Sequence, residues 1–279
     1  MKNSKLQIKT RKLVKEALLE DVGAGDVTTM SIADSVTPTE AVIAAKETGV
    51  IAGLEAAREV FRQVDKRARF RPLIKDGGRV KSGKVIARVY GPAPSLLIAE
   101  RTALNFLQRL SGIASQTSLF VAKVKGTRAK ILDTRKTTPG LRLLEKAAVK
   151  AGGGTNHRIG LYDAILIKDN HIAMAGGVAE AIRRARAKSK MPVEIEAKTI
   201  AQVKQAIKAK ADRILLDNMS LKNLRRAVKL CKKAQIKTEA SGGVGLKTVR
   251  AIAKTGVDFI SVGALTHSAK ALDLSLKII

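Results

Sequence analysis

The hydrophobic pattern of the second half of the chain alternates between short apolar runs and longer amphipathic stretches. Six short runs are typical of buried strands: 129–132, 164–167, 193–195, 213–216, 237–240 and 259–262. Between them, apolar residues recur at helical spacing over 141–150, 178–187, 200–209, 221–232 and 246–254. From residue 193 onward the strands begin 20 to 25 residues apart, as repeated βα units require. The pattern predicts a parallel sheet in a TIM-like β/α barrel, either closed or partly open, since six strands fall short of the eight of a regular barrel.

The first half of the chain has a different pattern, in which helical stretches surround short β-like pieces. These segments are 1–27, 41–45, 54–61, 84–89 and 94–125, of which the second and the fourth are β-like. The two halves of the chain therefore differ in their organisation.

Positive charge dominates the composition, with 53 Lys and Arg against 24 Asp and Glu, a net charge of +29 and a pI near 10.5. Such a charge suggests nucleic acid as a partner. The cations are spread from Lys2 to Lys277, however, and the 3% of aromatic residues include no Trp that could stack on bases. A solvated basic surface is the simpler interpretation, and steering of polyanionic small substrates is the alternative.

Cysteine, histidine and hydropathy exclude several other classes of protein. The single cysteine, Cys231, excludes an intrachain disulfide framework and a cysteine-based zinc site. The three histidines lack the spacing of a metal motif. No apolar run approaches the roughly 18 residues that span a bilayer, and no hydrophobic stretch follows the basic N-terminus. We expect a cytoplasmic protein with no membrane partner.

Polar residues follow every one of the predicted strands. In β/α barrels the catalytic residues converge from the carboxyl ends of several strands, so these positions are candidates for a site. A single one could cap a helix, but six consecutive strands that end this way favour a functional site. The residues are Asp133-Thr134-Arg135-Lys136, Lys168-Asp169-Asn170-His171, Glu196 with Lys198, Asp217-Asn218, Ser241-Gly242-Gly243, and Gly263-Ala264 with His267.

The residue types at these strand ends indicate an anionic, phosphorylated ligand. The glycine turns after the last two strands let backbone N–H groups approach a phosphate at a helix N-terminus. Several cations also cluster there, and burying them without anions is costly, so they predict a multiply anionic ligand. The cationic cluster comprises Arg135, Lys136, His157, Arg158 and Lys168.

Two acids complete the candidate site. Glu196 and Asp217 end neighbouring strands, and two carboxylates near phosphates bind Mg²⁺ or ribose hydroxyls. Glu194 lies on the same strand face as Glu196, because strand side chains alternate, and spacing alone does not decide which of the two reaches the ligand.

Long motifs across nearly the whole chain resemble the quinolinate phosphoribosyltransferases, also called nicotinate-nucleotide pyrophosphorylases. The motifs are ERTALN (100–105), LSGIA (110–114), DTRKTTPG (133–140), GGGTNHR (152–158), LIKDNH (166–171), LDNM (216–219), EASGG (239–243) and SVGALTH (261–267), with an N-terminal signature at 21–28. The resemblance implies transfer of phosphoribose from 5-phosphoribosyl-1-pyrophosphate to quinolinate in NAD biosynthesis. The transfer releases pyrophosphate and CO₂ and leaves nicotinate mononucleotide.

The same resemblance implies a role for each candidate residue. Quinolinate is bound by Arg101, Arg135, His157, Arg158 and Lys168. Lys136 faces the pyrophosphate, and Glu196 and Asp217 serve Mg²⁺, through water, and the ribose. Phosphate groups are held by Ser241, Gly242, Gly243, Gly263, Ala264 and His267.

The resemblance also implies an α/β protein of two domains. An N-terminal α/β sandwich domain with a linking helix takes residues 1–112, and the β/α barrel takes residues 113–279. It further implies an assembly. The expected unit is a homodimer, which can form a hexamer as a trimer of dimers, with Arg101 contributed in trans. Two alternatives stay open: a paralogous phosphoribosyltransferase with another acceptor, and, from a different class, a basic nucleic-acid-binding protein.

Overall fold

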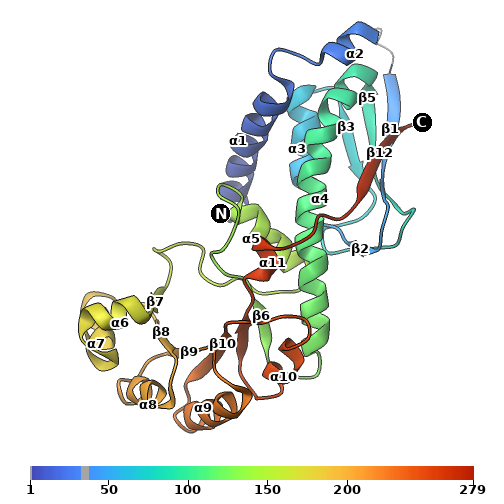
Figure 1. Cartoon of the computed structure of the whole chain (residues 1–279). Coiled ribbons are helices and arrows are strands. Elements are labelled where there is room, and N and C mark those ends of the chain that lie inside the picture. Colours follow the sequence, from blue (N-terminus) through green and yellow to red (C-terminus); the bar gives the residue numbers. More distant parts are fainter. Residues whose placement is uncertain (1, 33–37) are drawn as a thin grey trace. The chain divides into compact units, whose positions relative to one another are not determined.

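A computed structural model describes the backbone of residues 2–32 and 38–279, and the side chains of residues 6–32 and 38–279 (Figure 1). The chain divides into two compact units. The first comprises Met1–Ser118, Thr137–Gly153 and Thr266–Ile279, and the second comprises Leu119–Lys136 and Gly154–Leu265. No single cut in the sequence produces this division. It differs from the expected domains 1–112 and 113–279, because two segments of the second half pack with the first unit.

The first unit is built on an antiparallel four-stranded sheet in the order β12-β1-β5-β3. On β1 the alternate residues Ala41, Ile43 and Ala45 are all fully buried, as expected for a strand with one face on the core. The strands are β1 (Pro38–Ala45), β3 (Arg69–Pro72), β5 (Val85–Pro92) and β12 (Leu274–Ile278), and a separate pair joins β2 (Gly49–Val50) to β4 (Arg79–Val80).

Helices cover this sheet and bury their apolar faces in one core. On α3, Ala57, Val60 and Phe61 are fully buried, at the spacing of one helix face. The helices of the unit are α1 (Lys2–Val22), α2 (Val27–Ile32), α3 (Leu54–Val64), α5 (Arg142–Ala151) and the first part of α4 (Ala93–Val124). Strand β12, which the sequence pattern did not predict, returns the end of the chain to the edge of this sheet beside β1.

The second unit holds all six predicted strands in one parallel sheet, ordered β6-β11-β10-β9-β8-β7. Among the described residues the edge strands β6 and β7 do not pair with each other, and Thr155 bridges to Leu132 of β6. The mixed α/β fold is therefore confirmed, with a partly open sheet. The strands are β6 (Lys130–Leu132), β7 (Ile165–Ile167), β8 (Val193–Ala197), β9 (Arg213–Asp217), β10 (Lys237–Ser241) and β11 (Phe259–Ser261).

Amphipathic helices connect these strands, and Figure 1 shows α7, α8 and α9 alongside β8, β9 and β10. On α9 the buried residues Leu224, Ala227, Val228 and Cys231 form one helical face. Ser220 caps α9 by accepting the Asn223 N–H. The helices are α6 (Asp169–Ala175), α7 (Val178–Lys188), α8 (Ile200–Lys208), α9 (Leu221–Lys233) and α10 (Val249–Ala253), with α11 (Ala264–His267) at the unit boundary.

The strand register brings the carboxyl ends of the parallel strands to one edge of the sheet. Asp217 pairs with Ser241, and the strands on either side end within two residues of the same level. The polar residues that follow the strands therefore meet at this edge. Within the described part of the chain, no helix is long and apolar enough to cross a membrane.

Candidate active site

A cavity of about 480 Å³ lies at this edge of the parallel sheet, entirely within the second unit. Most of the sequence-predicted residues line it: Arg135, Lys136, His157, Arg158, Lys168, Glu196, Asp217, Ser241, Gly242 and Gly263. Gly243, Ala264 and His267 are not among its lining residues, and Arg101 lies exposed on α4 in the first unit. The edge thus brings ten of the fourteen candidates together.

Two guanidinium groups share this cavity. Burial lowers the pKa of Arg158, and the positive charge of Arg135 lowers it further. The Arg158 Nη1 donates to the carbonyl oxygen of Ala164 at 3.3 Å. Two partly buried cations that line one cavity favour a ligand with more than one negative charge. Lys136 and Lys168 are exposed at the same edge.

Two carboxylates lie among these cations. Burial and then the charge of Asp217 raise the pKa of Glu196, as expected for neighbouring acids. The Asp217 carboxylate accepts the Ser241 hydroxyl at 2.7 Å and the Asn218 amide at 2.9 Å, which fixes its orientation. Lys198 Nζ lies 3.7 Å from Glu196 Oε1.

The donor set of Glu196 and Asp217 fits Mg²⁺. This ion uses one or two carboxylates and keeps waters or substrate phosphates as its other ligands. A divalent cation would also relieve the repulsion between these two carboxylates. Within the described residues, His157, Glu194 and Glu239 are the only three groups of metal-ligand type that lie within 4.8 Å of one another. That cluster is less suited to a metal, because Arg213 Nη1 already lies 3.1 Å from Glu239 Oε2.

The structure answers which acid of β8 reaches the cavity. Glu196 lines it, whereas Glu194 is 7% exposed and its Oε2 lies 3.1 Å from His157 Nε2. Burial lowers the pKa of His157, but the hydrogen bonds and charges of Glu194 and Glu239 outweigh burial and raise it to about 9. The His157 Nδ1 accepts the Arg158 N–H at 2.8 Å, a bond that needs an unprotonated Nδ1 and opposes that shift. Both ring nitrogens therefore have partners inside the chain.

The glycine turn after β10 is only partly as predicted. Gly242 and Gly243 adopt positive φ values of 88° and 58°, so the turn requires glycine-like backbone. The following helix, α10, begins only at Val249, so no helix N-terminus stands directly behind this turn. The turn after β11 leads at once into α11, through Gly263.

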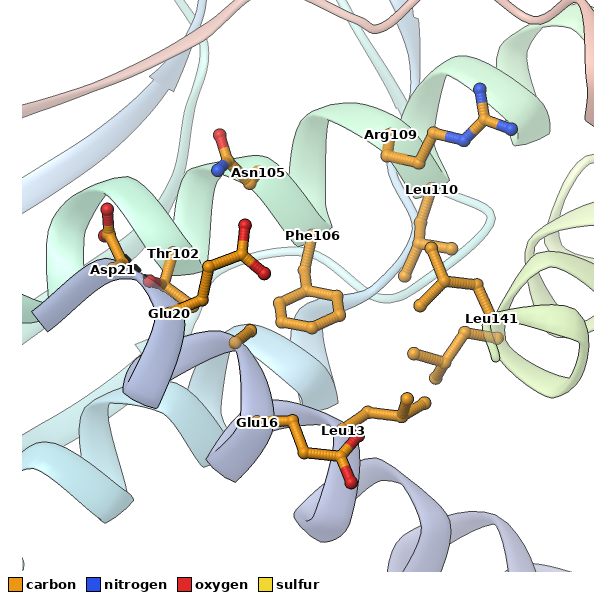
Figure 2. Close-up of a pocket in the computed structure, with 12 residues that line it drawn as sticks. Leu13, Glu16, Glu20, Asp21, Thr102, Asn105, Phe106, Arg109, Leu110 and Leu141 are labelled. Carbon is orange, nitrogen blue, oxygen red and sulfur yellow. Dashed lines mark hydrogen bonds between the residues drawn. The ribbon is translucent and has the colours of Figure 1, made fainter. Parts of the chain in front are cut away.

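A second cavity, of about 360 Å³, lies in the first unit between α1, α4 and α5 (Figure 2). Phe106 and several leucines give it an apolar floor, and Glu16, Glu20 and Asp21 lie at its rim. Its one arginine, Arg109, is bound to the buried Glu145 at 2.8 Å. A dianionic ligand would meet net negative charge here, so the cavity of the second unit is the candidate active site.

Comparison with known proteins identifies the family. Residues 26–111 match the family model "Quinolinate phosphoribosyl transferase, N-terminal domain", and residues 113–277 match its C-terminal counterpart. The chain belongs to the quinolinate phosphoribosyltransferase family. This confirms the resemblance seen in the sequence motifs.

Relatives in this family match the chain over nearly its full length. The probable nicotinate-nucleotide pyrophosphorylase [carboxylating] of Bacillus subtilis is 47% identical, over 97% of this chain and 94% of its own. The solved nicotinate-nucleotide pyrophosphorylase of Francisella tularensis is 42% identical with a TM-score of 0.93, and covers 98% of this chain and 97% of its own. The Pyrococcus furiosus enzyme of that name, 17% identical with a TM-score of 0.72, shares the fold over 99% of this chain and 76% of its own.

Sequence reasoning assigned no role to several residues that line the cavity of this family member. Glu239 and Ser261 belong to β10 and β11, and Thr134 and Asn218 follow β6 and β9. Thr134 and Asn218 stand inside the strand-end motifs but carry no charge that singles them out. Glu239 offered a signal that was overlooked, because a glutamate inside a buried parallel strand needs a partner.

Proposed function

We propose that the chain transfers phosphoribose from 5-phosphoribosyl-1-pyrophosphate to quinolinate, and forms nicotinate mononucleotide, pyrophosphate and CO₂ for NAD biosynthesis. One observation carries the proposal: the Arg135 and Arg158 guanidinium groups share a cavity with the Glu196 and Asp217 carboxylates. Quinolinate brings two carboxylates for the guanidinium groups, and the ribose centre of the second substrate becomes cationic next to the acids. The names of the relatives support the same reaction.

The cations of the cavity bind quinolinate in this proposal. Arg135 and Arg158 present planar donor pairs that match carboxylates in bidentate geometry, and Lys168 adds a flexible point charge. We place Arg101 of a second protomer in the same set, as the family resemblance implies, since it is exposed on α4 and is not among the residues that line the cavity. This arrangement makes the active unit a homodimer.

The second substrate is held through its phosphates and its ribose. We assign the 5′-phosphate to Ser241, Gly242, Gly243, Gly263, Ala264 and His267, whose turns expose backbone N–H groups and side-chain donors. Lys136, exposed at the cavity edge, neutralises the pyrophosphate. Glu196 and Asp217 would hold Mg²⁺ through water, and the bound ion supplies charge neutralisation to the leaving pyrophosphate.

The chemistry needs positioning and charge more than a nucleophilic side chain. The bond between ribose C1 and the pyrophosphate oxygen breaks, and a bond from C1 to the pyridine nitrogen forms. Glu196 and Asp217 stabilise the cationic character of C1, and Lys136 stabilises the departing anion. The C2 carboxylate then leaves as CO₂, and its bonding electrons remain on C2 beside the positive ring nitrogen, where a proton replaces it.

The choice of acceptor distinguishes this function from that of a phosphoribosyltransferase that uses another acceptor. Steady-state kinetics with quinolinate and with nicotinate should show turnover of quinolinate alone. Arg158→Gln should raise the KM for quinolinate about tenfold or more, because a charge-assisted hydrogen bond is lost. Arg184→Gln is the matched control, since Arg184 is an exposed residue of α7 that pairs with Glu180. Equal turnover of nicotinate would establish the paralogue with another acceptor instead.

A further inference from the structure

Four ionisable side chains meet at one side of the active-site cavity, and no step of the reaction above uses them. Glu194 on β8, Arg213 on β9 and Glu239 on β10 come from adjacent strands, and His157 comes from the segment before β7. Arg213 Nη1 lies 3.1 Å from Glu239 Oε2 and 3.7 Å from Glu194 Oε2. His157 Nε2 lies 3.1 Å from Glu194 Oε2 and 3.4 Å from Glu239 Oε2. We call these four residues the buried charge network.

The buried charge network is costly to build. Glu239 is fully buried and Glu194 nearly so, and a buried carboxylate is tolerated only with good partners. Arg213 lies over the ring of Phe259, with 4.3 Å between its Cζ and the ring centroid, and the Ser261 hydroxyl donates to Glu239. Apolar side chains of similar volume commonly stabilise a core at least as well as buried ions. Stability alone therefore does not account for the network.

The His157 ring is held on two sides by the chain. Its Nε2 faces the two glutamates, and its Nδ1 accepts the N–H of Arg158. The backbone N–H of His157 donates to Asp133 Oδ1 at 2.8 Å, and Asp133 Oδ2 accepts the Asn156 side chain at 2.5 Å. Ring and backbone are thus both anchored, so His157 has little freedom to turn toward a ligand.

The anchored His157 ring helps to hold Arg158, the next residue in the chain, in its position in the cavity. The Arg158 guanidinium lines the same cavity as that of Arg135, where a dianionic ligand would meet both cations. Holding a cation in such a place needs a rigid backbone, because a free loop would let the arginine swing into water. The anchored ring and the Arg158 N–H bond to it supply that rigidity.

We propose that Glu239, with Glu194, is a positioning residue for quinolinate binding: it fixes the His157 ring, which in turn fixes Arg158. His157 then acts as an anchor and does not donate to the substrate carboxylates. This inference rests on the proposed function, since it assigns a role in binding the acceptor. It predicts that disturbing the network weakens quinolinate binding and leaves the chemical step unchanged.

A double-mutant cycle on Glu239 and His157 tests the proposal. Glu239→Gln and His157→Asn should each raise the KM for quinolinate about tenfold, and kcat and the KM for 5-phosphoribosyl-1-pyrophosphate should stay within about twofold. The double variant should be no worse than His157→Asn, because both changes break one connected path. His157→Gln places its amide nitrogen near the position of Nε2 but has no acceptor where Nδ1 accepts the Arg158 N–H, so it should not restore the affinity. Glu180→Gln on α7 is the matched control.

Two outcomes of this cycle would overturn the proposal. Effects of Glu239→Gln and His157→Asn that multiply in the double variant would mean that Glu239 does not act through His157. An equal loss in kcat or in the KM for the second substrate would mean a general structural role. If Glu239→Gln does not fold, Ser261→Ala takes its place in the same cycle, since that hydroxyl donates to Glu239.

A spectroscopic measurement separates this inference from the proposed function. In ¹⁵N-labelled protein the His157 Nε2–H should be visible and protected from exchange with water, because it donates to buried carboxylates. Glu239→Gln should shift or broaden that signal, and Glu180→Gln should leave it in place. A signal unchanged in Glu239→Gln overturns the inference whatever the enzyme assay shows. Absence of any turnover of quinolinate by the wild type overturns the proposed function and leaves this readout intact.

Discussion

The turn after β10 offers a matched pair of glycines that differ in one contact. Gly242 and Gly243 both have positive φ, so alanine at either position adds backbone strain of about 1–2 kcal/mol. A Cβ on Gly243 would meet no atom within 4 Å. A Cβ on Gly242 would lie 2.1 Å from Asn218 Oδ1, well inside the 3.4 Å at which ordinary van der Waals contact begins, so the Asn218 side chain would have to move.

Displacement of Asn218 has a further consequence for the site. Its side-chain amide donates to Asp217 Oδ2 at 2.9 Å, and a hydrogen bond to a charged group is worth about 1.5–3 kcal/mol. Gly243→Ala should therefore lower the free energy of unfolding only by the added backbone strain, about 1–2 kcal/mol. Gly242→Ala should lower the free energy of unfolding by about 2.5–5 kcal/mol, since it adds the backbone strain and breaks the hydrogen bond.

Calorimetry and kinetics together distinguish the two variants. Thermal unfolding should place Gly242→Ala below Gly243→Ala by several degrees, at about 2–4 °C per kcal/mol. The KM for 5-phosphoribosyl-1-pyrophosphate should rise about tenfold or more in Gly242→Ala, and within about threefold in Gly243→Ala. The same KM in both variants, or a larger loss in Gly243→Ala, would refute the contact between Gly242 and Asn218 as the reason for glycine here.

Three further predictions concern the acids, the thiol and the assembly. Asp217→Asn and Glu196→Gln should each lower kcat about a hundredfold or more and leave quinolinate binding by titration calorimetry nearly unchanged; a loss of quinolinate affinity would place the acids elsewhere. Burial raises the pKa of Cys231 to about 11, so the native thiol should resist alkylation at pH 8, and Cys231→Ser should keep near-normal activity; loss of activity in the folded variant would contradict the site assignment. Inactive Arg101→Ala and Lys136→Ala, refolded together at equal ratio, should regain roughly a quarter of wild-type activity in a dimer with shared sites; no recovery, with mixed dimers verified by native mass spectrometry, would place Arg101 in its own chain's site.

The sequence predicts the parallel sheet and most of its site because both follow local rules. Six apolar runs at regular spacing mark buried strands, and parallel strands bring their carboxyl ends to one edge, so Asp217 and Ser241 had to meet. The Gly-Gly turn was recognised from its composition, since only glycine adopts its backbone easily. The sequence did not predict that α10 begins six residues after Gly243, because helix boundaries depend on packing.

Other features depend on contacts between distant parts of the chain. The return of β12 to β1 joins residues 229 to 237 positions apart, as in the pairing of Ala41 with Ile278, and a short strand carries no local mark of its partner. The buried charge network has the same origin. Glu194 and Glu196 share a strand face, so the sequence does not separate their roles. The structure does, because Glu194 pairs with His157 and Arg213, whereas Glu196 lines the cavity.

Product analysis tests the central claim most directly. The protein is mixed with 5-phosphoribosyl-1-pyrophosphate, Mg²⁺ and quinolinate labelled with ¹³C in its 2-carboxylate, and all products are quantified. The proposed function predicts equal amounts of nicotinate mononucleotide, pyrophosphate and labelled CO₂. A nucleotide that retains the label, or pyrophosphate released without CO₂, would contradict it.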